Sequence, residues 1–257
     1  MPSPAEDSVE AGSATSASEG ACMIALDHIA IWSGNLYRTT VELSRETGIG
    51  SADGGWFPGL GLGQKILSLG GTVYVEIESI VDHRNILDGH PVALELERQT
   101  AAGDCFAGLC LRSDDMAEIE AFAAHRGVEV STEIAGGKVL MVPGQKRGKA
   151  AHAPDFLHSW LLGKPNIYYV SDLDSHSSLL APQPGTGEVE GLGVTSLELG
   201  GTEDDLRDWL GDIDISGLGV DLRFNGRSDG LYAVGFDSTA GPQEIRLSPI
   251  TLQPQFS

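Results

Sequence analysis

A short apolar strand pattern, a capped amphipathic helix and a glycine recur three times along the chain. In the first copy, alternating residues over 24–32 lead into a helical pattern over 36–48. The second copy begins at residue 106 and the third at residue 194, and each again ends its helix at a glycine. The spacing, roughly 80–90 residues, is too long for a solenoid and fits repeated modules of a β-rich fold. Of the three strands, only the first contains a histidine, His28.

Residues that commonly cap helices mark the ends of these units. Asn35, Asp114 and Thr202 stand where the three helices should begin, because their side-chain oxygens can accept hydrogen bonds from the first helical turn. Gly48 closes the first helix, and glycines stand at the corresponding places of the other two. The caps therefore support three helices, each directly following a strand.

The segments between these units predict further strands and loops. Residues 65–69 and 73–80 form a hairpin pattern around a Gly-Gly turn, whereas the glycine-rich residues 50–63 are predicted as a loop. Residues 82–103 fit either a helix or a strand, and the basic residues 143–154 are predicted as an exposed loop. Additional strands are predicted at 139–142, 156–162, 219–224, 231–236 and 243–247. This order indicates an α+β fold with repeated βαβββ modules, whose mixed and antiparallel sheets form a cup around a central cavity.

The same pattern divides the chain into five segments. Residues 1–22 are rich in Ala, Ser and Glu, and we expect a disordered acidic tail because they cannot bury enough apolar surface to fold. Two modules are predicted at 23–103 and 104–171 and a linker at 172–191. A third, partial module is predicted at 192–257.

Composition narrows the possible partners. The net charge of −21 disfavours nucleic acid, because phosphates would be repelled and no basic stripe offsets the repulsion. No apolar run approaches the roughly 18–20 residues of a membrane span, and the N-terminal residues lack the features of a secretory or transit signal. The three cysteines are too few and too scattered for a disulfide framework. We therefore expect a cytoplasmic protein that binds neither nucleic acid nor a membrane.

Polar side chains inside two apolar strands are the first candidate functional residues. His28 lies on a strand face with Leu26 and Ala30, and Glu76 shares a face with Tyr74 and Glu78 on the strand 73–80. Burying a carboxylate is costly unless it is paired or coordinated, so these carboxylates indicate a function. A hydrogen-bonded core histidine and an exposed sheet face are the alternative explanations.

Other candidates come from the aromatic residues and from a second histidine. His158 alternates with Phe156 and Trp160 on the predicted strand 156–162. An apolar substrate pocket could be lined by Trp32, Trp56, Phe57 and Trp160, although such residues also form ordinary cores. The sequence contains neither a phosphate-binding loop nor a Gly-x-Ser-x-Gly motif, which argues against nucleotide binding and hydrolysis by a serine nucleophile.

Three motifs of the first half support a family resemblance. They are Leu26-Asp27-His28-Ile29-Ala30, Phe57-Pro58-Gly59-Leu60-Gly61 and Tyr74-Val75-Glu76-Ile77, and the segments 109–126 and 155–160 continue the pattern. On these residues the chain resembles the glyoxalase-like proteins of the vicinal-oxygen-chelate superfamily, over residues 25–247. The resemblance implies βαβββ modules paired around a cupped site. In many members one divalent metal ion there holds two adjacent oxygens of the substrate.

Carried onto this chain, the resemblance implies His28 and Glu76 as metal ligands, and His158 could complete the set. The later units depart from the family pattern, because Gly108 and Thr195 stand opposite His28 when the units are aligned. A site of imidazole and carboxylate groups suits Zn, Mn, Fe, Co or Ni ions. Within such a site, Glu78 would act as a base or support a ligand, and Tyr74 would donate a hydrogen bond.

Together these observations predict a divalent-metal-dependent enzyme that acts on a small oxygenated organic molecule. The fold does not select among isomerase, lyase, dioxygenase and hydrolase chemistry. The alternative is a metal-free protein that binds or sequesters a small molecule, which the missing ligands at Gly108 and Thr195 favour. A regulatory protein that acts through its acidic tail is a third possibility. Repeats within one chain predict a self-contained site, in a monomer or a homodimer.

Overall fold

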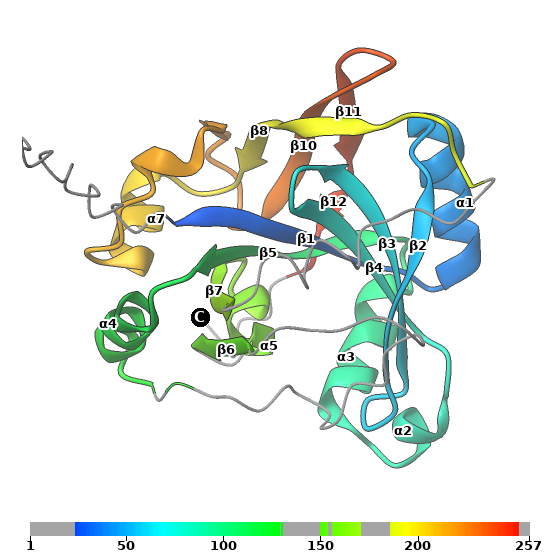
Figure 1. Cartoon of the computed structure of the whole chain (residues 1–257). Coiled ribbons are helices and arrows are strands. Elements are labelled where there is room, and N and C mark those ends of the chain that lie inside the picture. Colours follow the sequence, from blue (N-terminus) through cyan, green and yellow to red (C-terminus); the bar gives the residue numbers. More distant parts are fainter. Residues whose placement is uncertain (1–23, 129, 131–149, 154–155, 171–185, 252–257) are drawn as a thin grey trace, which may run out of the picture.

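Two mixed sheets and their covering helices make up the protein (Figure 1). The computed structural model describes residues 24–128, 130, 150–153, 156–170 and 186–251. The larger sheet contains β1 (Ala25–Trp32), β2 (Ser51–Phe57), β3 (Leu62–Gly70), β4 (Val73–Ile80), β5 (Cys105–Ser113), β6 (Ala150–Ala153), β7 (Asn166–Val170) and β12 (Ser248–Pro249). The smaller sheet contains β8 (Gly191–Leu199), β9 (Asp221–Phe224), β10 (Leu231–Ser238) and β11 (Gln243–Arg246). The predicted α+β class is confirmed.

The helices alternate with these strands along the chain. They are α1 (Leu36–Thr47), α2 (Arg84–Leu87), α3 (Pro91–Thr100), α4 (Met116–Arg126), α5 (Phe156–Leu161) and α7 (Glu203–Leu210), with a short 3-10 turn at Ser216–Leu218. None of the helices among the described residues is long and apolar enough to cross a membrane.

The strand order shows how the units are joined. The larger sheet runs β2-β3-β4-β1-β5-β7-β6, with β12 added beside β5. β1 pairs in parallel with β4, and β5 pairs in parallel with β7, so the second unit repeats the pairing of the first. The antiparallel pair β1–β5 joins the two units. In the smaller sheet β9 pairs in parallel with β8, a strand order that differs from that of the first unit.

The central strands of the larger sheet, β1, β4 and β5, are buried on both faces. In Figure 1 the smaller sheet lies on one side of it, and α2, α3 and α5 lie on the other. Toward the smaller sheet, Ile29 and Ile31 of β1 join a large apolar core with Phe236 of β10. Toward the helices, Trp32 of β1 packs in a second core with residues of α3 and α5. We call this second face the helical face of the sheet.

Most of the predicted caps are present. The Asn35 side chain accepts a hydrogen bond from the Arg38 backbone N–H at 3.0 Å, and Gly48 takes the left-handed conformation at φ 75°. Thr202 forms a full capping box at the start of α7. The second helix is capped by Asp115 instead of the predicted Asp114, because the chain continues extended through one more residue.

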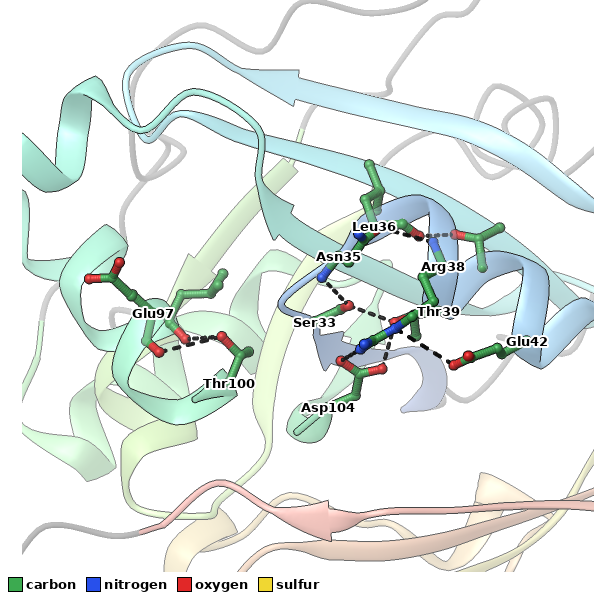
Figure 2. A network of polar contacts seen from close by, with 11 residues as sticks. Ser33, Asn35, Leu36, Arg38, Thr39, Glu42, Glu97, Thr100 and Asp104 are labelled. Atoms are coloured by element: carbon green, nitrogen blue, oxygen red, sulfur yellow. Dashed lines mark hydrogen bonds and ion pairs between the residues drawn. The ribbon is translucent and has the colours of Figure 1, made fainter. Parts of the chain in front are cut away.

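A polar network ties the start of α1 to the strand β5. Figure 2 shows Ser33, Thr39 and Asp104 meeting beside the first turn of α1. The Thr39 hydroxyl donates to the Asp104 carboxylate at 2.5 Å, and the Ser33 and Thr39 oxygens are 2.7 Å apart. Because Asp104 directly precedes β5, this network fixes the end of β1 and the start of β5 relative to each other.

Three predicted elements are corrected by the structure. Residues 51–57, predicted as loop, form β2, in which a Cβ on Gly54 would lie 2.7 Å from the Cβ of Gln64. The glycines there allow close approach of two strands rather than a turn. Residues 156–161 form α5 instead of a strand, because Phe156 and Trp160 fit a helical spacing of four as well as an alternation. Residues 150–153, predicted as loop, form β6.

Most of the other predicted helices and strands are confirmed, and some fall on residues that the structure does not describe. The hairpin appears as β3 and β4, and the strands of the third unit appear as β9, β10 and β11. The ambiguous residues 82–103 contain α2 and α3. The predicted tail at 1–22, the strand at 139–142 and most of the linker at 172–191 lie outside the described residues. The module boundaries stay predictions.

The segment after the smaller sheet returns to the larger one. The Ile250 backbone N–H donates to the Phe106 carbonyl of β5 at 3.0 Å. At the next residue, Thr251 exchanges two hydrogen bonds with the Gln99 side chain of α3, at 2.8 and 2.9 Å. The segment thus links β5 to the helix that covers the helical face.

Candidate functional site

A β-bulge in β1 places two neighbouring polar side chains together. The pairing of β1 with β5 shifts register between Leu26 and His28. Successive residues of a regular strand point to opposite faces, but here His28 Nδ1–H donates to Asp27 Oδ1 at 2.6 Å. The predicted common face of Leu26 and His28 is wrong, because Leu26 packs with Ile29 in the core toward the smaller sheet. The bulge breaks the simple alternation.

The His28 ring is held on several sides. The Tyr74 ring stacks on it at a centroid distance of 5.1 Å and an angle of 20°, and the Tyr168 ring of β7 lies tilted at 5.6 Å. Burial disfavours the charged imidazole, yet the neighbouring Cys110, Asp27 and Glu76 raise the pKa of His28 well above its usual value. The neighbouring groups therefore outweigh the effect of burial on the pKa of His28.

Two buried carboxyl groups lie on the strand next to His28. In the parallel register of β1 and β4, Tyr74 lies opposite His28, Glu76 opposite Ala30 and Glu78 opposite Trp32. Directly opposite residues of paired strands share a face of the sheet, so Glu76 and Glu78 lie on the face of His28. Glu76 and Glu78 are each only 5% exposed. The sheet therefore buries an imidazole and two carboxyl groups on neighbouring strands.

Glu78 is fixed by a chain of hydrogen bonds. Gln64 Nε2–H donates to Glu78 Oε1 and Trp32 Nε1–H donates to Glu78 Oε2, both at 3.0 Å. The Gln64 side-chain oxygen in turn accepts from the Gly55 backbone N–H at 3.0 Å. Burial, together with the negative charge of Glu76, raises the pKa of Glu78 to about 8. The hydrogen bonds from Gln64 and Trp32 favour the ionised form and only partly offset this rise in pKa.

The predicted substrate-contacting aromatic residues divide into two groups. Trp32, Phe57 and Trp160 belong to the core of the helical face, whereas Trp56 is only partly buried and belongs to none of the apolar cores of the described residues. The Trp32 and Trp160 rings meet edge to face, with centroids 6.3 Å apart and an interplanar angle of 72°. These rings pack against each other in the space predicted as a pocket.

Gly108 makes room for the Trp160 ring. A Cβ at residue 108 would lie 2.1 Å from Cδ1 and Nε1 of Trp160. The second unit therefore places no side chain opposite β1 at this position, and an indole fills the space instead.

This close approach predicts the effect of adding one methyl group. Gly108→Ala should lower the free energy of unfolding by about 2–3 kcal/mol, because the added carbon would displace a buried ring. Urea unfolding followed by tryptophan fluorescence measures the change. Gly34→Ala is the control, since the nearest neighbour of its added Cβ would be 3.8 Å away. Equal stability of the two variants would contradict the packing.

Several residues of the site were not predicted from the sequence. Asp27 precedes His28 in the first sequence motif, but the motif alone does not indicate its hydrogen bond to the His28 ring. Gln64, Cys110 and Tyr168 lie on three other strands. Gln64 is a buried amide, at 7% exposure, but its neighbours Gly63 and Lys65 give no local sign of burial. Nothing local indicates Tyr168, because its contact depends on the pairing of β7 with β5.

The metal ligands expected from the resemblance are only partly brought together. His28 and Glu76 lie on one face of β1 and β4, whereas His158 lies in α5 rather than on a strand, and its side chain lies outside the described residues. Within the described part of the chain, no three His, Cys, Asp or Glu side chains could together hold a metal ion. Among the described side chains, His28 and Glu76 are thus two of the three ligands that the resemblance implies.

The comparison with protein families decides the relationship. Residues 26–160 match the model of the glyoxalase-like domain family. The chain belongs to this family. The glyoxalase-like protein is thus a member of the vicinal-oxygen-chelate superfamily, as the sequence motifs predicted, and the match begins at the strand that carries His28. No curated protein matches the chain.

Solved structures are similar to the chain at low sequence identity. A hypothetical protein from Staphylococcus aureus matches with a TM-score of 0.54 and 14% identity, over 80% of this chain and 88% of the other. The methylmalonyl-CoA epimerase of Mycobacterium tuberculosis has a TM-score of 0.37 and 14% identity, over 57% of this chain and 86% of its own. A mutant 4-hydroxymandelate synthase from Streptomyces coelicolor has values of 0.44 and 13%, over 78% of this chain and 62% of its own. The similarity to the Staphylococcus aureus protein supports the fold. It does not indicate a substrate.

Proposed function

We propose that the glyoxalase-like protein is an enzyme that moves a proton at a carbon next to an oxygen function of a small organic molecule. The observation that carries the proposal is the pair of buried carboxyl groups, Glu76 and Glu78, on the strand beside His28. Buried ionisable groups destabilise a fold, and groups with perturbed pKa values concentrate at functional sites. Apolar side chains in place of Glu76 and Glu78 could fill this face of the sheet, so packing alone does not explain the two carboxyl groups.

The proposed roles follow from the placement of the three groups on one face and from the raised pKa values of His28 and Glu78. Glu76 is the proposed base, which takes the proton from carbon while the electron pair moves to the neighbouring oxygen. The imidazolium of His28 stabilises the resulting enolate-like anion. Glu78, whose pKa is raised by burial and by Glu76, returns a proton to carbon and completes the transfer. Tyr74 keeps the His28 ring in place by stacking on it.

The surroundings of these groups favour a small and largely apolar substrate. Trp32 contacts the Glu78 carboxyl group, Trp160 packs on Trp32, and Phe57 belongs to the same core. Residues of α3 and α5 cover this face in the structure. A substrate must therefore displace part of this packing to reach Glu76, which limits the size of the molecule that fits.

Hydrogen exchange at carbon tests the proposal. The protein in D₂O is incubated with a panel of 2-hydroxy ketones, 2-oxo aldehydes and acyl thioesters, and loss of the C–H signal is followed by proton NMR. Glu76→Gln and Glu78→Gln should each slow exchange by about 100-fold or more, the usual contribution of a general acid or base. Glu97→Gln, at an exposed position of α3, is the control and should exchange at the normal rate. Catalysed exchange that both site variants retain in full would contradict the proposal.

A divalent ion and metal-free binding are tested separately. The carboxylate hydrogen bond to His28 Nδ1 resembles the support that metal-binding histidines commonly have, which favours a metal experiment. The protein is incubated with Mn, Fe, Co, Ni or Zn ions and analysed for bound metal, with His28→Ala as the comparison. A site that stays empty defeats the metal-dependent alternative. Tight binding of a panel compound that neither a chelator nor His28→Ala changes would instead favour a binding protein.

A further inference from the structure

Arg112 of β5 reaches across to β1 at the bulge beside His28. Arg112 Nη1–H donates to the Leu26 carbonyl at 2.6 Å and lies 3.6 Å from Asp27 Oδ2. Arg112 Nη2–H donates to the Thr72 hydroxyl at 2.6 Å, in the turn between β3 and β4. The Arg112 side chain is only 13% exposed. One guanidinium thus joins the bulge, the Asp27 carboxylate and the turn that precedes β4.

These contacts suit the chemistry of the bulge. A bulge interrupts the regular ladder, so a backbone carbonyl there needs a donor from elsewhere. The planar guanidinium supplies several donors in a fixed arrangement, which a single ammonium group does not. Asp27 then has one carboxylate oxygen at the His28 ring and the other toward Arg112.

We propose that Arg112 is a positioning residue of the site, which holds the bulge and the Asp27 carboxylate so that the His28 ring keeps one orientation. This inference rests on the proposed function, in which His28 contacts the substrate oxygen. Asp27 holds the ring at Nδ1, and the Cys110 side chain also hydrogen-bonds to it. The second unit thus contributes Arg112 at the bulge, in addition to Cys110 opposite His28 and the Tyr168 ring beside it.

The His28 imidazole N–H provides a direct readout. In proton NMR, a short hydrogen bond to a buried carboxylate gives a far-downfield N–H resonance that exchanges slowly with water, and His28→Asn identifies it by its loss. Arg112→Met should abolish this resonance or move it upfield while the far-UV circular dichroism stays unchanged. Arg246→Met is the matched control, because Arg246 pairs with Glu198 and Glu244 of the smaller sheet. An unchanged resonance in folded Arg112→Met overturns the proposal.

Milder variants keep the test decisive if Arg112→Met does not fold. Thr72→Ala removes one contact of Arg112 without touching Asp27, and Arg112→Lys keeps the charge but not the fork of donors. Both should speed the exchange of the His28 N–H with water several-fold, and wild-type exchange in both overturns the proposal.

Activity distinguishes this inference from the proposed function. Where a panel compound shows catalysed exchange, Arg112→Met should lower kcat at least tenfold and change KM little, and Arg112→Lys should restore part of the rate. Loss of the His28 resonance in a protein that exchanges no panel compound would support the positioning role while contradicting the proposed enzyme. If Arg112→Met retains the resonance and also full activity on a panel compound, the proposed enzyme is supported and the positioning role of Arg112 is contradicted.

Discussion

Replacing Glu78 with glutamine is expected to flatten the pH dependence of stability. Glu78 has a pKa of about 8 in the folded protein against an ordinary value of 4.5, so between these values the folded chain binds a proton that the unfolded chain has released. Its contribution is therefore complete below pH 4.5 and is lost as the pH rises toward 8. The wild-type free energy of unfolding should fall by on the order of 4 kcal/mol across this range, since each pKa unit corresponds to about 1.36 kcal/mol. Urea unfolding at several pH values measures the difference in slope.

The hydrogen bonds of Glu78 predict where the two stability curves cross. A glutamine can still accept from Gln64, but its amide nitrogen cannot accept from Trp32 Nε1–H. Glu78→Gln should therefore be less stable than wild type by about 1 kcal/mol at pH 5 and more stable at pH 8 and above. Glu97→Gln, on an exposed turn of α3, should follow the wild-type curve. Equal slopes for wild type and Glu78→Gln would show that Glu78 titrates normally.

Removing the indole of Trp160 should give the largest loss of stability in the core of the helical face. Trp160 is buried between Trp32 and the backbone at Gly108, so Trp160→Ala leaves a cavity that the sheet cannot close. The expected loss in free energy of unfolding is about 3–5 kcal/mol. Trp56→Ala is the control of the same residue type, and because Trp56 is only partly buried its loss should be clearly smaller.

The cavity itself provides a second measurement. An apolar cavity of this kind can bind a small aromatic molecule, and binding to the folded state raises the apparent stability. Added indole should raise the thermal midpoint of Trp160→Ala and leave those of wild type and Trp56→Ala unchanged. A loss below about 1 kcal/mol together with no response to indole would show that Trp160 does not fill this space.

The sequence predicted those parts of the fold that depend on local signals. The caps at Asn35 and Thr202 and the hairpin of β3 and β4 are formed by neighbouring residues, and their patterns identified them. β2 was missed because Gly54, which serves a close approach between strands, has the same local appearance as a turn glycine. The strand predicted in place of α5 has a similar cause, since six residues cannot distinguish an alternation from a helical spacing.

Only the residues of the candidate site on β1 and β4 could be predicted from the sequence. His28 and Glu76 stand out as polar residues in apolar strands, and the structure brings them to one face through the register of β1 and β4. Their functional roles stay predictions. Tyr168 and Arg112 reach His28 and Asp27 through long-range strand pairing, and the bulge that turns Asp27 toward His28 exists only once β5 lies beside β1. No local pattern encodes such contacts.

The return of the chain to β5 has a consequence for how the protein folds during synthesis. Ile250 completes both the edge of β5 and the core of the helical face, and Thr251 holds α3. The larger sheet therefore stays incomplete on the ribosome until these residues have left the exit tunnel. Contacts between residues so far apart in sequence slow folding, because the intervening chain must lose its freedom first.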